Sequence, residues 1–283
     1  MLRCSTSPRP QLGYTLVELV TVIVLLGFVG IFTFRYLGFG AQIYSDTTGR
    51  EQLISQSRFA VERLSLELRN ALPRSIRVDD SDNQRCIEFL PVITSSNYLQ
   101  IPRPGLTAND DFIVVEPIRS DQLEGRYLFV YATSTQFIYG PSNLRRKEID
   151  TVDLDTPQSG LLTINYNTTP SFFPTESPAR RYYVTGNPVS WCYNEAQNRL
   201  ERYSDYGLSQ NQNTHAELLS SATYEVMAVN LVNDTSQTDE RPFRVFEPTL
   251  QRNNLVQIDW RFQRGSSNEP LQILHEVHAP NVP

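Results

Sequence analysis

The sequence is poor in the residues that most often build metal centres and nucleic-acid interfaces. Its 283 residues include three cysteines and three histidines, too few for a protein with several metal sites. Basic residues are also in deficit, because Lys and Arg total 25 against 31 Asp and Glu, for a net charge of −6. Nucleic-acid binding requires cations that neutralise phosphates. We therefore expect neither a multi-site metalloprotein nor a general nucleic-acid binder.

Motifs of common catalytic and metal sites are missing as well. The chain has no G-x-S-x-G nucleophile motif and no G-x-x-x-x-G-K-[ST] nucleotide loop. His275 and His278 are three residues apart, a spacing that sends the two rings to opposite faces of a strand. The acidic run at residues 79–83 lacks the glycine and distal glutamate of an EF-hand loop, which predicts a solvated turn. We expect a protein that is not an enzyme and holds no metal or cofactor.

The chain does contain one long apolar segment near its start. Residues 14–34 carry a single charge, Glu18. As a helix they would span about 31 Å, at roughly 1.5 Å per residue, which matches the roughly 30 Å hydrocarbon core of a bilayer. Arg3 and Arg9 precede the segment and favour a cytoplasmic N-terminus. The pattern predicts a single membrane-spanning helix.

Two other interpretations of this segment make different predictions. A cleavable secretory signal has a shorter apolar region followed by small residues, whereas this run ends in Phe-Thr-Phe at residues 32–34. A plain signal anchor accounts for everything except Glu18, because an ionisable group in a membrane helix costs about 2.5–3.5 kcal/mol. If the chain were cut after Gly13, the new α-amine of Tyr14 on a neighbouring copy would compensate that carboxylate.

The run Gly-Tyr-Thr-Leu-Val-Glu at residues 13–18 resembles the type IV prepilin motif, in which an aromatic or apolar residue follows the glycine and a lone glutamate follows in an apolar span. The resemblance implies that a prepilin peptidase cuts between Gly13 and Tyr14 on the cytoplasmic side and methylates the new N-terminus. It also implies that Glu18 guides assembly against a neighbouring subunit. Tyr14 departs mildly from the family, where phenylalanine is usual.

Such a cut would change the cysteine count. It removes Cys4 and leaves Cys86 and Cys192, both on the far side of the membrane. An even pair in an oxidising compartment predicts a disulfide, and two free buried thiols are the alternative.

The remaining chain predicts an amphipathic half-helix followed by a β-rich head. Apolar residues at spacings of three, four and seven indicate that the helix continues over residues 35–72, stopped by Pro73. Short runs rich in β-branched and aromatic residues predict strands at 75–78, 86–92, 112–116, 127–133, 161–166, 181–184, 189–193, 224–232, 255–263 and 271–277. Residues 139–181 and 204–214 otherwise look like polar loop insertions, and the basic run at residues 145–147 predicts a loop surface.

We therefore expect an α+β fold of the type IV pilin kind, a long N-terminal helix packed on a mostly antiparallel β-rich head. The expected parts are a leader at 1–13, a membrane and assembly half-helix at 14–34, an amphipathic half-helix at 35–72 and a periplasmic head at 73–283.

A narrower resemblance covers residues 13–92 and, more weakly, the rest of the chain. It is similar to the MshO family of minor pilin-like proteins, in the wider group of PilW and the J-class pseudopilins. The segments that carry it lie at residues 38–40, 43–46, 49–53, 58–64, 66–73, 86–91 and 275–283.

The narrower resemblance implies a minor subunit of an MSHA-like type IV pilus that acts in assembly or at the filament tip. Its expected partners are other pilin subunits, a prepilin peptidase and the inner membrane, with no nucleic acid. It would be a single-pass inner-membrane protein that later enters a filament on the cell surface. A pseudopilin of a secretion or DNA-uptake machine is the first alternative, and a membrane-anchored periplasmic enzyme is a remote one.

Overall fold

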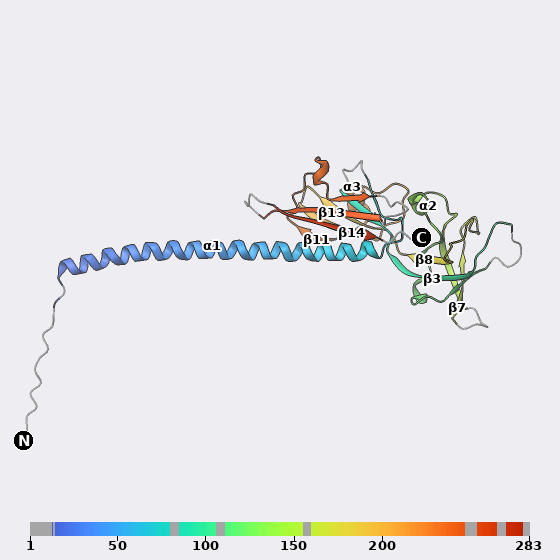
Figure 1. Cartoon of the computed structure of the whole chain (residues 1–283), viewed down its shortest axis with the longest axis horizontal. Helices are drawn as coiled ribbons and strands as arrows, with labels where there is room; N and C mark the ends of the chain where they lie inside the picture. Colours follow the sequence, from blue (N-terminus) through green and yellow to red (C-terminus); the bar gives the residue numbers. More distant parts are fainter. Residues whose placement is uncertain are drawn as a thin grey trace, which may run out of the picture. The chain divides into compact units, whose positions relative to one another are not determined.

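The computed structural model describes residues 13, 15–79, 85–105, 111–154, 160–246, 254–264 and 270–279. The chain forms two compact units, Met1–Gln52 and Leu53–Pro283. Helix α1 (Leu16–Arg69) runs from the first unit into the second. In the first unit, the described residues outside this helix are residues 13 and 15. The second unit is otherwise dominated by antiparallel strands (Figure 1). The expected α+β class, a long helix followed by an antiparallel β-rich head, is confirmed.

Helix α1 ends three residues before the predicted position. The backbone of Ala71 forms an isolated β-bridge with Pro91, and the N–H of Leu72 donates to the carbonyl of Leu90 at 2.8 Å. These bonds take the chain into the sheet before Pro73 is reached. The helix therefore ends because tertiary β pairing competes with the helical hydrogen bonds.

The second part of α1 buries the apolar face that the spacing predicts. Leu64 and Leu68 are fully buried, and the same cluster holds Trp191 and Trp260 from the sheets. Burying one leucine side chain contributes about 1.5–3 kcal/mol. The core of the head therefore lies between this stretch of helix and two sheets.

One polar group on α1 reinforces this packing. The carboxylate of Glu67 accepts hydrogen bonds from Arg63 Nε at 2.7 Å, from Trp191 Nε1 at 2.9 Å and from Arg202 Nε at 3.0 Å. Charge-assisted bonds of this kind are stronger than neutral ones and fix geometry. They hold the helix in register with the sheet beneath it.

The two sheets are antiparallel. The five-stranded sheet has the order β1 (Arg77–Val78), β2 (Cys86–Phe89), β9 (Val189–Asn194), β10 (Arg199–Ser204) and β11 (Thr223–Val229). The three-stranded sheet has the order β12 (Phe243–Phe246), β13 (Asn254–Phe262) and β14 (Leu271–Ala279).

Six further strands close into a barrel with its own apolar core. Their order is β3 (Val92–Gln100), β4 (Phe112–Val115), β7 (Leu161–Tyr166), β6 (Arg146–Leu154), β5 (Tyr127–Phe129) and β8 (Arg181–Thr185). Short helices lie between strands at α2 (Thr135–Tyr139), α3 (His215–Ser221), η2 (Ser120–Gln122) and η3 (Thr238–Glu240).

The barrel is inserted between two neighbouring strands of the five-stranded sheet. Strands β2 and β9 pair directly, with Phe89 opposite Val189, and the whole barrel lies between them in sequence. The chain enters and leaves the barrel at one place, because Val92 of β3 is opposite Thr185 of β8. Ends that lie close together are the usual geometry of an inserted module.

The prediction of a loop at residues 139–181 is wrong for residues 146–154, which form β6, whereas β7 lies where a strand was predicted. Strands β10 and β12 and nearly all of β3 were also missed. Polar residues interrupt the apolar residues in β3 and β10, and Glu201 of β10 is itself buried, while β12 is only four residues long. The placement of residues 145–147 on a loop surface is likewise wrong, because Arg146 and Lys147 belong to β6 and Lys147 is fully buried.

Candidate functional site

The first part of α1 exposes an apolar surface that nothing in the described chain covers. Its large apolar side chains are all exposed, among them Leu19, Ile23, Leu26 and Phe32. The helix is long and apolar enough to cross a membrane. Exposed apolar surface of this extent marks a lipid or protein contact. This surface is the first component of the candidate site.

Glu18 lies in the first turn of α1 and is exposed. Its backbone N–H donates to Thr15 Oγ1 at 3.3 Å, and its carbonyl accepts from Thr21 Oγ1 at 2.9 Å. A carboxylate near a helix N-terminus is favoured by the helix dipole. Within the described residues its carboxylate has no ion pair, so its charge is available to a partner.

The sequence also carries a signal for the start of the helix. Thr15 and Glu18 have the S/T-x-x-E spacing of a capping box, and the hydroxyl half of that box is present. Thr15 thus fixes where α1 begins. Gly13 lies just before this start, outside any helix or strand. Tyr14, the predicted first residue after cleavage and the predicted methylation site, lies outside the described residues.

The predicted disulfide joins Cys86 of β2 to Cys192 of β9. The two residues are directly opposite in the β2–β9 register, with their Cα atoms 4.1 Å apart. Both side chains are buried. The alternative of two free thiols is therefore not what the structure shows, and the bridge closes the pair of strands from which the barrel emerges.

The two histidines of β14 do not converge. His275 lies on the half-buried face of the strand and His278 on the exposed face, as their spacing predicts. Of the acidic run at residues 79–83, only Asp79 is described. In the described parts of the chain, no group of three or more His, Cys, Asp or Glu is placed to hold a metal ion.

A carboxylate–histidine contact in the head was not visible from sequence. Glu201 is fully buried, and its Oε2 lies 2.6 Å from Tyr203 Oη and 3.1 Å from His215 Nε2. Tyr203 Oη also lies 3.1 Å from the same Nε2. In a catalytic triad the two ring nitrogens contact different partners. Here Nε2 contacts both Glu201 and Tyr203, and these contacts tie the start of α3 to β10.

The only lysine of the chain lies inside the head. Lys147 is fully buried, and its Nζ donates to the carbonyl of Asn143 at 2.7 Å and to the carbonyl of Pro170. The rings of Tyr166 and Phe173 flank the amine at 5.8 and 5.2 Å. Burial lowers the pKa of Lys147 to about 8 from its ordinary 10.5.

This lysine should make the stability of the head depend on pH. Between pH 8 and 10.5 the unfolded chain keeps a proton that the folded chain has lost, so the free energy of unfolding rises with pH. Relative to Lys147→Met, we expect the wild type to gain up to about 1.4 kcal/mol per pH unit in this window. Urea unfolding of both proteins at a series of pH values measures the difference. Parallel pH profiles would contradict it.

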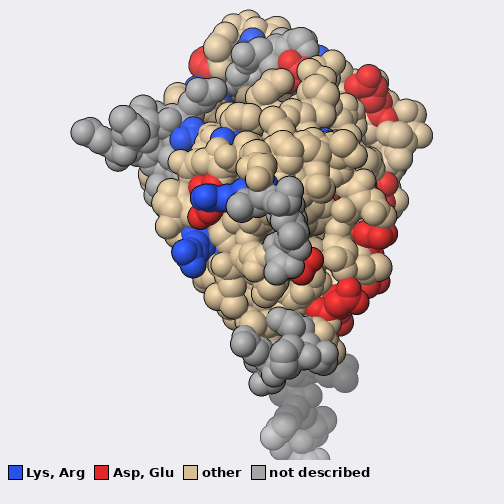
Figure 2. Space-filling model, turned by 90° about the vertical axis from the view of Figure 1, so that its right-hand side faces the viewer, with Lys and Arg blue, Asp and Glu red and all other residues tan. Residues whose placement is uncertain are grey.

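The face of the molecule shown in Figure 2 is mostly uncharged, with acidic side chains gathered along one side and a smaller number of basic ones along the other. This face offers no continuous basic surface of the kind that tracks a phosphate backbone. No protein family, curated protein or solved structure matches the chain. Function must therefore be inferred from the residues and geometry of the chain itself.

Proposed function

We propose that this chain is a minor pilin-like subunit of an MSHA-like type IV pilus, processed by a prepilin peptidase and assembled through its N-terminal helix. The observation that supports this most is the uncovered apolar surface of α1 with one carboxylate, Glu18, in its first turn. Lipid is a suitable environment for the apolar side chains but an expensive one for the charge. A bundle of identical or related helices would cover the apolar side chains and would also allow the carboxylate to be paired.

In the proposed mechanism, the cut between Gly13 and Tyr14 creates an α-amine four residues before Glu18. On a helix, the amine and the carboxylate of one chain lie near the same end. A neighbouring subunit displaced along the bundle axis places its amine beside the carboxylate of the first. An opposite charge is the natural compensation for a carboxylate in a low-dielectric bundle. Assembly would thus be driven by apolar packing and its register set by this pair.

The head plays a separate role in this proposal. It has a disulfide and two sheets around the second part of α1, and it carries an inserted barrel. A subunit with such a large head suits a low-copy position, at the tip or in filament initiation. It would reside in the inner membrane with a periplasmic head before it enters the filament.

N-terminal mass spectrometry tests the processing step. In cells with a prepilin peptidase we expect the mature chain to begin at Tyr14 with one methyl group on its α-amine. Because Lys147 is the only lysine, its peptide is the single internal amine control for any amine-directed reagent. Protein from cells without the peptidase should begin at Met1. A mature chain that still starts at Met1, or that is cut after residue 34, would sink the processing proposal.

A further inference from the structure

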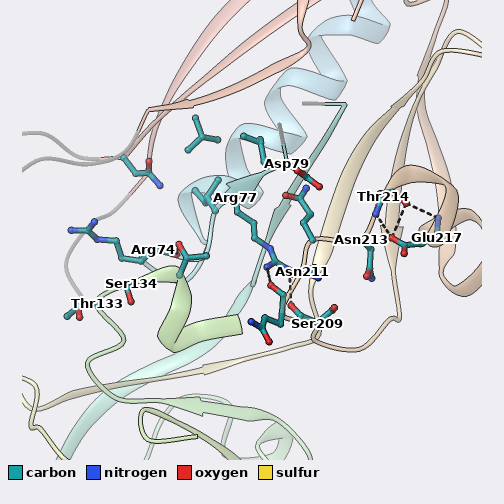
Figure 3. Close-up of a pocket in the computed structure, with 17 residues that line it drawn as sticks. Arg74, Arg77, Asp79, Thr133, Ser134, Ser209, Asn211, Asn213, Thr214 and Glu217 are labelled. Carbon is teal, nitrogen blue, oxygen red and sulfur yellow. Dashed lines mark hydrogen bonds between the residues drawn. The ribbon is translucent and has the colours of Figure 1, made fainter. Parts of the chain in front are cut away.

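The head carries an open polar groove of about 1020 Å³, with a lining that comes mainly from within residues 74–79, 133–135 and 209–214 (Figure 3). Arg77 in this groove donates hydrogen bonds to the carboxylate of Glu88 at 2.6 Å and to two backbone carbonyls of the loop at 209–210. The charge of Arg77 therefore holds the walls of the groove together and is not offered to a ligand. The apolar surface of α1 is more informative, because its residue types indicate what covers it.

The exposed apolar surface of α1 continues past residue 34, where the expected membrane segment ends. After Arg35, residues 36–45 carry no charge, and their large apolar side chains are exposed. Residues 19–45 span about 40 Å along the helix, at roughly 1.5 Å per residue. This length exceeds the roughly 30 Å hydrocarbon core of a bilayer. The bilayer can therefore take more than one position along α1.

Two charges, Glu18 and Arg35, decide which position costs least. They are about 26 Å apart along the helix axis, at roughly 1.5 Å per residue, which is less than the thickness of the hydrocarbon core. Both residues therefore cannot lie outside the hydrocarbon at once. A glutamate side chain is short, whereas an arginine can extend its guanidinium to the headgroups from a few ångströms below the boundary. The least costly position places Glu18 at the cytoplasmic boundary and Arg35 about 4 Å inside the opposite one.

The aromatic residues of this stretch lie where the opposite boundary of the bilayer would then fall. If Glu18 marks the cytoplasmic boundary, a span of about 20 residues ends near Gly38. The aromatic belt, which consists of Tyr36, Phe39 and Tyr44, lies within two turns of this position and is exposed. Tyrosine is enriched at the membrane–water boundary, because its ring is apolar and its hydroxyl can be hydrated. The aromatic belt therefore supports the same position of the bilayer as the two charges.

We propose that lipid covers α1 as far as Tyr44, with hydrocarbon around residues 19–38. In this position Glu18 lies at the level of the cytoplasmic headgroups, which avoids the cost of a carboxylate in hydrocarbon before any helix bundle forms. The guanidinium of Arg35 binds lipid phosphates of the opposite leaflet, and the aromatic belt lies at the level of their headgroups. This inference shares with the proposed function only that α1 spans a bilayer. It depends neither on cleavage nor on entry into a filament.

Spin-label depth measurements on the full chain, in vesicles of phosphatidylethanolamine and phosphatidylglycerol, test this position. A Cys4→Ser background leaves the disulfide of the head intact, and single cysteines at positions 22–32 then carry a nitroxide. Collisions with oxygen and with a water-soluble nickel complex report the depth of each label. We expect the deepest label at residues 28–29, the midpoint of the proposed span. A span over residues 14–34 would instead place the deepest label at residue 24.

The substitution Arg35→Glu tests the role of side-chain reach. Two short carboxylates of equal cost should centre the helix between them, so the deepest label should move to residues 26–27, about 3 Å along the helix. Arg35→Lys keeps a long cationic side chain and should leave the depth profile unchanged. Arg50→Glu, which changes an exposed arginine beyond the aromatic belt, should leave it unchanged as well.

Two results would overturn this inference alone. One is a deepest label near residue 24 in the wild type, and the other is a depth profile that Arg35→Glu does not move. A profile in which no label enters the hydrocarbon would overturn the inference together with the proposed residence in a membrane.

Discussion

Replacing Glu18 by alanine is expected to leave the protein inserted and folded while its incorporation into filaments falls about tenfold or more. Breaking a buried ion pair by removing one partner costs about 3–5 kcal/mol, since the remaining charge is left uncompensated. Insertion itself should not suffer, because the substitution removes a charge from an apolar helix. Nor should the helix start shift, because the N–H of residue 18 still donates to Thr15 Oγ1, a bond that needs no carboxylate.

Fractionation into membrane and sheared-filament pools measures this effect. Glu18→Gln keeps the size of the side chain and removes its charge, so it should assemble as poorly as the alanine variant. Glu51→Ala removes an exposed glutamate from the same helix and should assemble as the wild type does. If Glu18→Ala enters filaments at the wild-type level, the carboxylate has no part in assembly.

Removing the disulfide should have the largest effect on the stability of the head. Cys86 and Cys192 are 106 residues apart, and closing a loop of that length lowers the entropy of the unfolded chain by the equivalent of about 4–5 kcal/mol. We expect the double variant Cys86→Ala with Cys192→Ala to lose stability of this order. Both sites are buried, and alanine avoids introducing an unpaired hydroxyl there.

Urea unfolding of the wild type and the double variant measures that loss. The wild type unfolded in reductant is the matched control, and it should approach the double variant, because the loop constraint is absent in both. Reductant should leave the variant unchanged. Without reductant, the free energies of unfolding of the wild type and the double variant should differ clearly. A difference below about 1 kcal/mol would show that the bridge does not constrain the unfolded chain as the loop model requires.

The long helix and its buried face were predictable because their signals are local. The apolar spacing that includes Leu64 and Leu68 repeats with the period of a helix, and the same residues are buried in the structure. The end of α1 was less predictable, since it depends on a bridge between Ala71 and Pro91 across the sheet. The local apolar pattern predicts that a helix forms, whereas the residue at which the helix ends depends on pairing with a distant part of the chain.

The head was predictable as a set of strands but not as a topology. Its division into two sheets and a closed barrel depends on pairings such as Val92 with Thr185, which no local pattern contains. Strand β6 alternates buried and charged positions, and its buried face includes Lys147. From the sequence alone, a lysine at such a position is predicted to be exposed to solvent. Its burial depends on the carbonyls of Asn143 and Pro170, which the fold places beside its amine.

Two other regions of the chain also differ in how far the sequence predicts them. The prepilin-like run at residues 13–18 is contiguous, so the sequence alone predicts the cut, the methylation and the role of Glu18. The polar groove of the head is assembled from stretches far apart in the sequence, which include Arg74, Gln212 and Asn254. No local pattern predicts that these residues come together.

The most direct test of the proposed assembly role is the amount of wild-type protein in sheared filaments from cells with and without a prepilin peptidase. We expect the chain, detected by an antibody to its head, in the filament pool of cells that have the peptidase. In cells that lack the peptidase it should be confined to the membrane pool, because the uncut leader withholds the α-amine of Tyr14 from a neighbouring Glu18. Absence from filaments in both strains, or equal entry into filaments without cleavage, would contradict the proposal that this protein is a processed filament subunit.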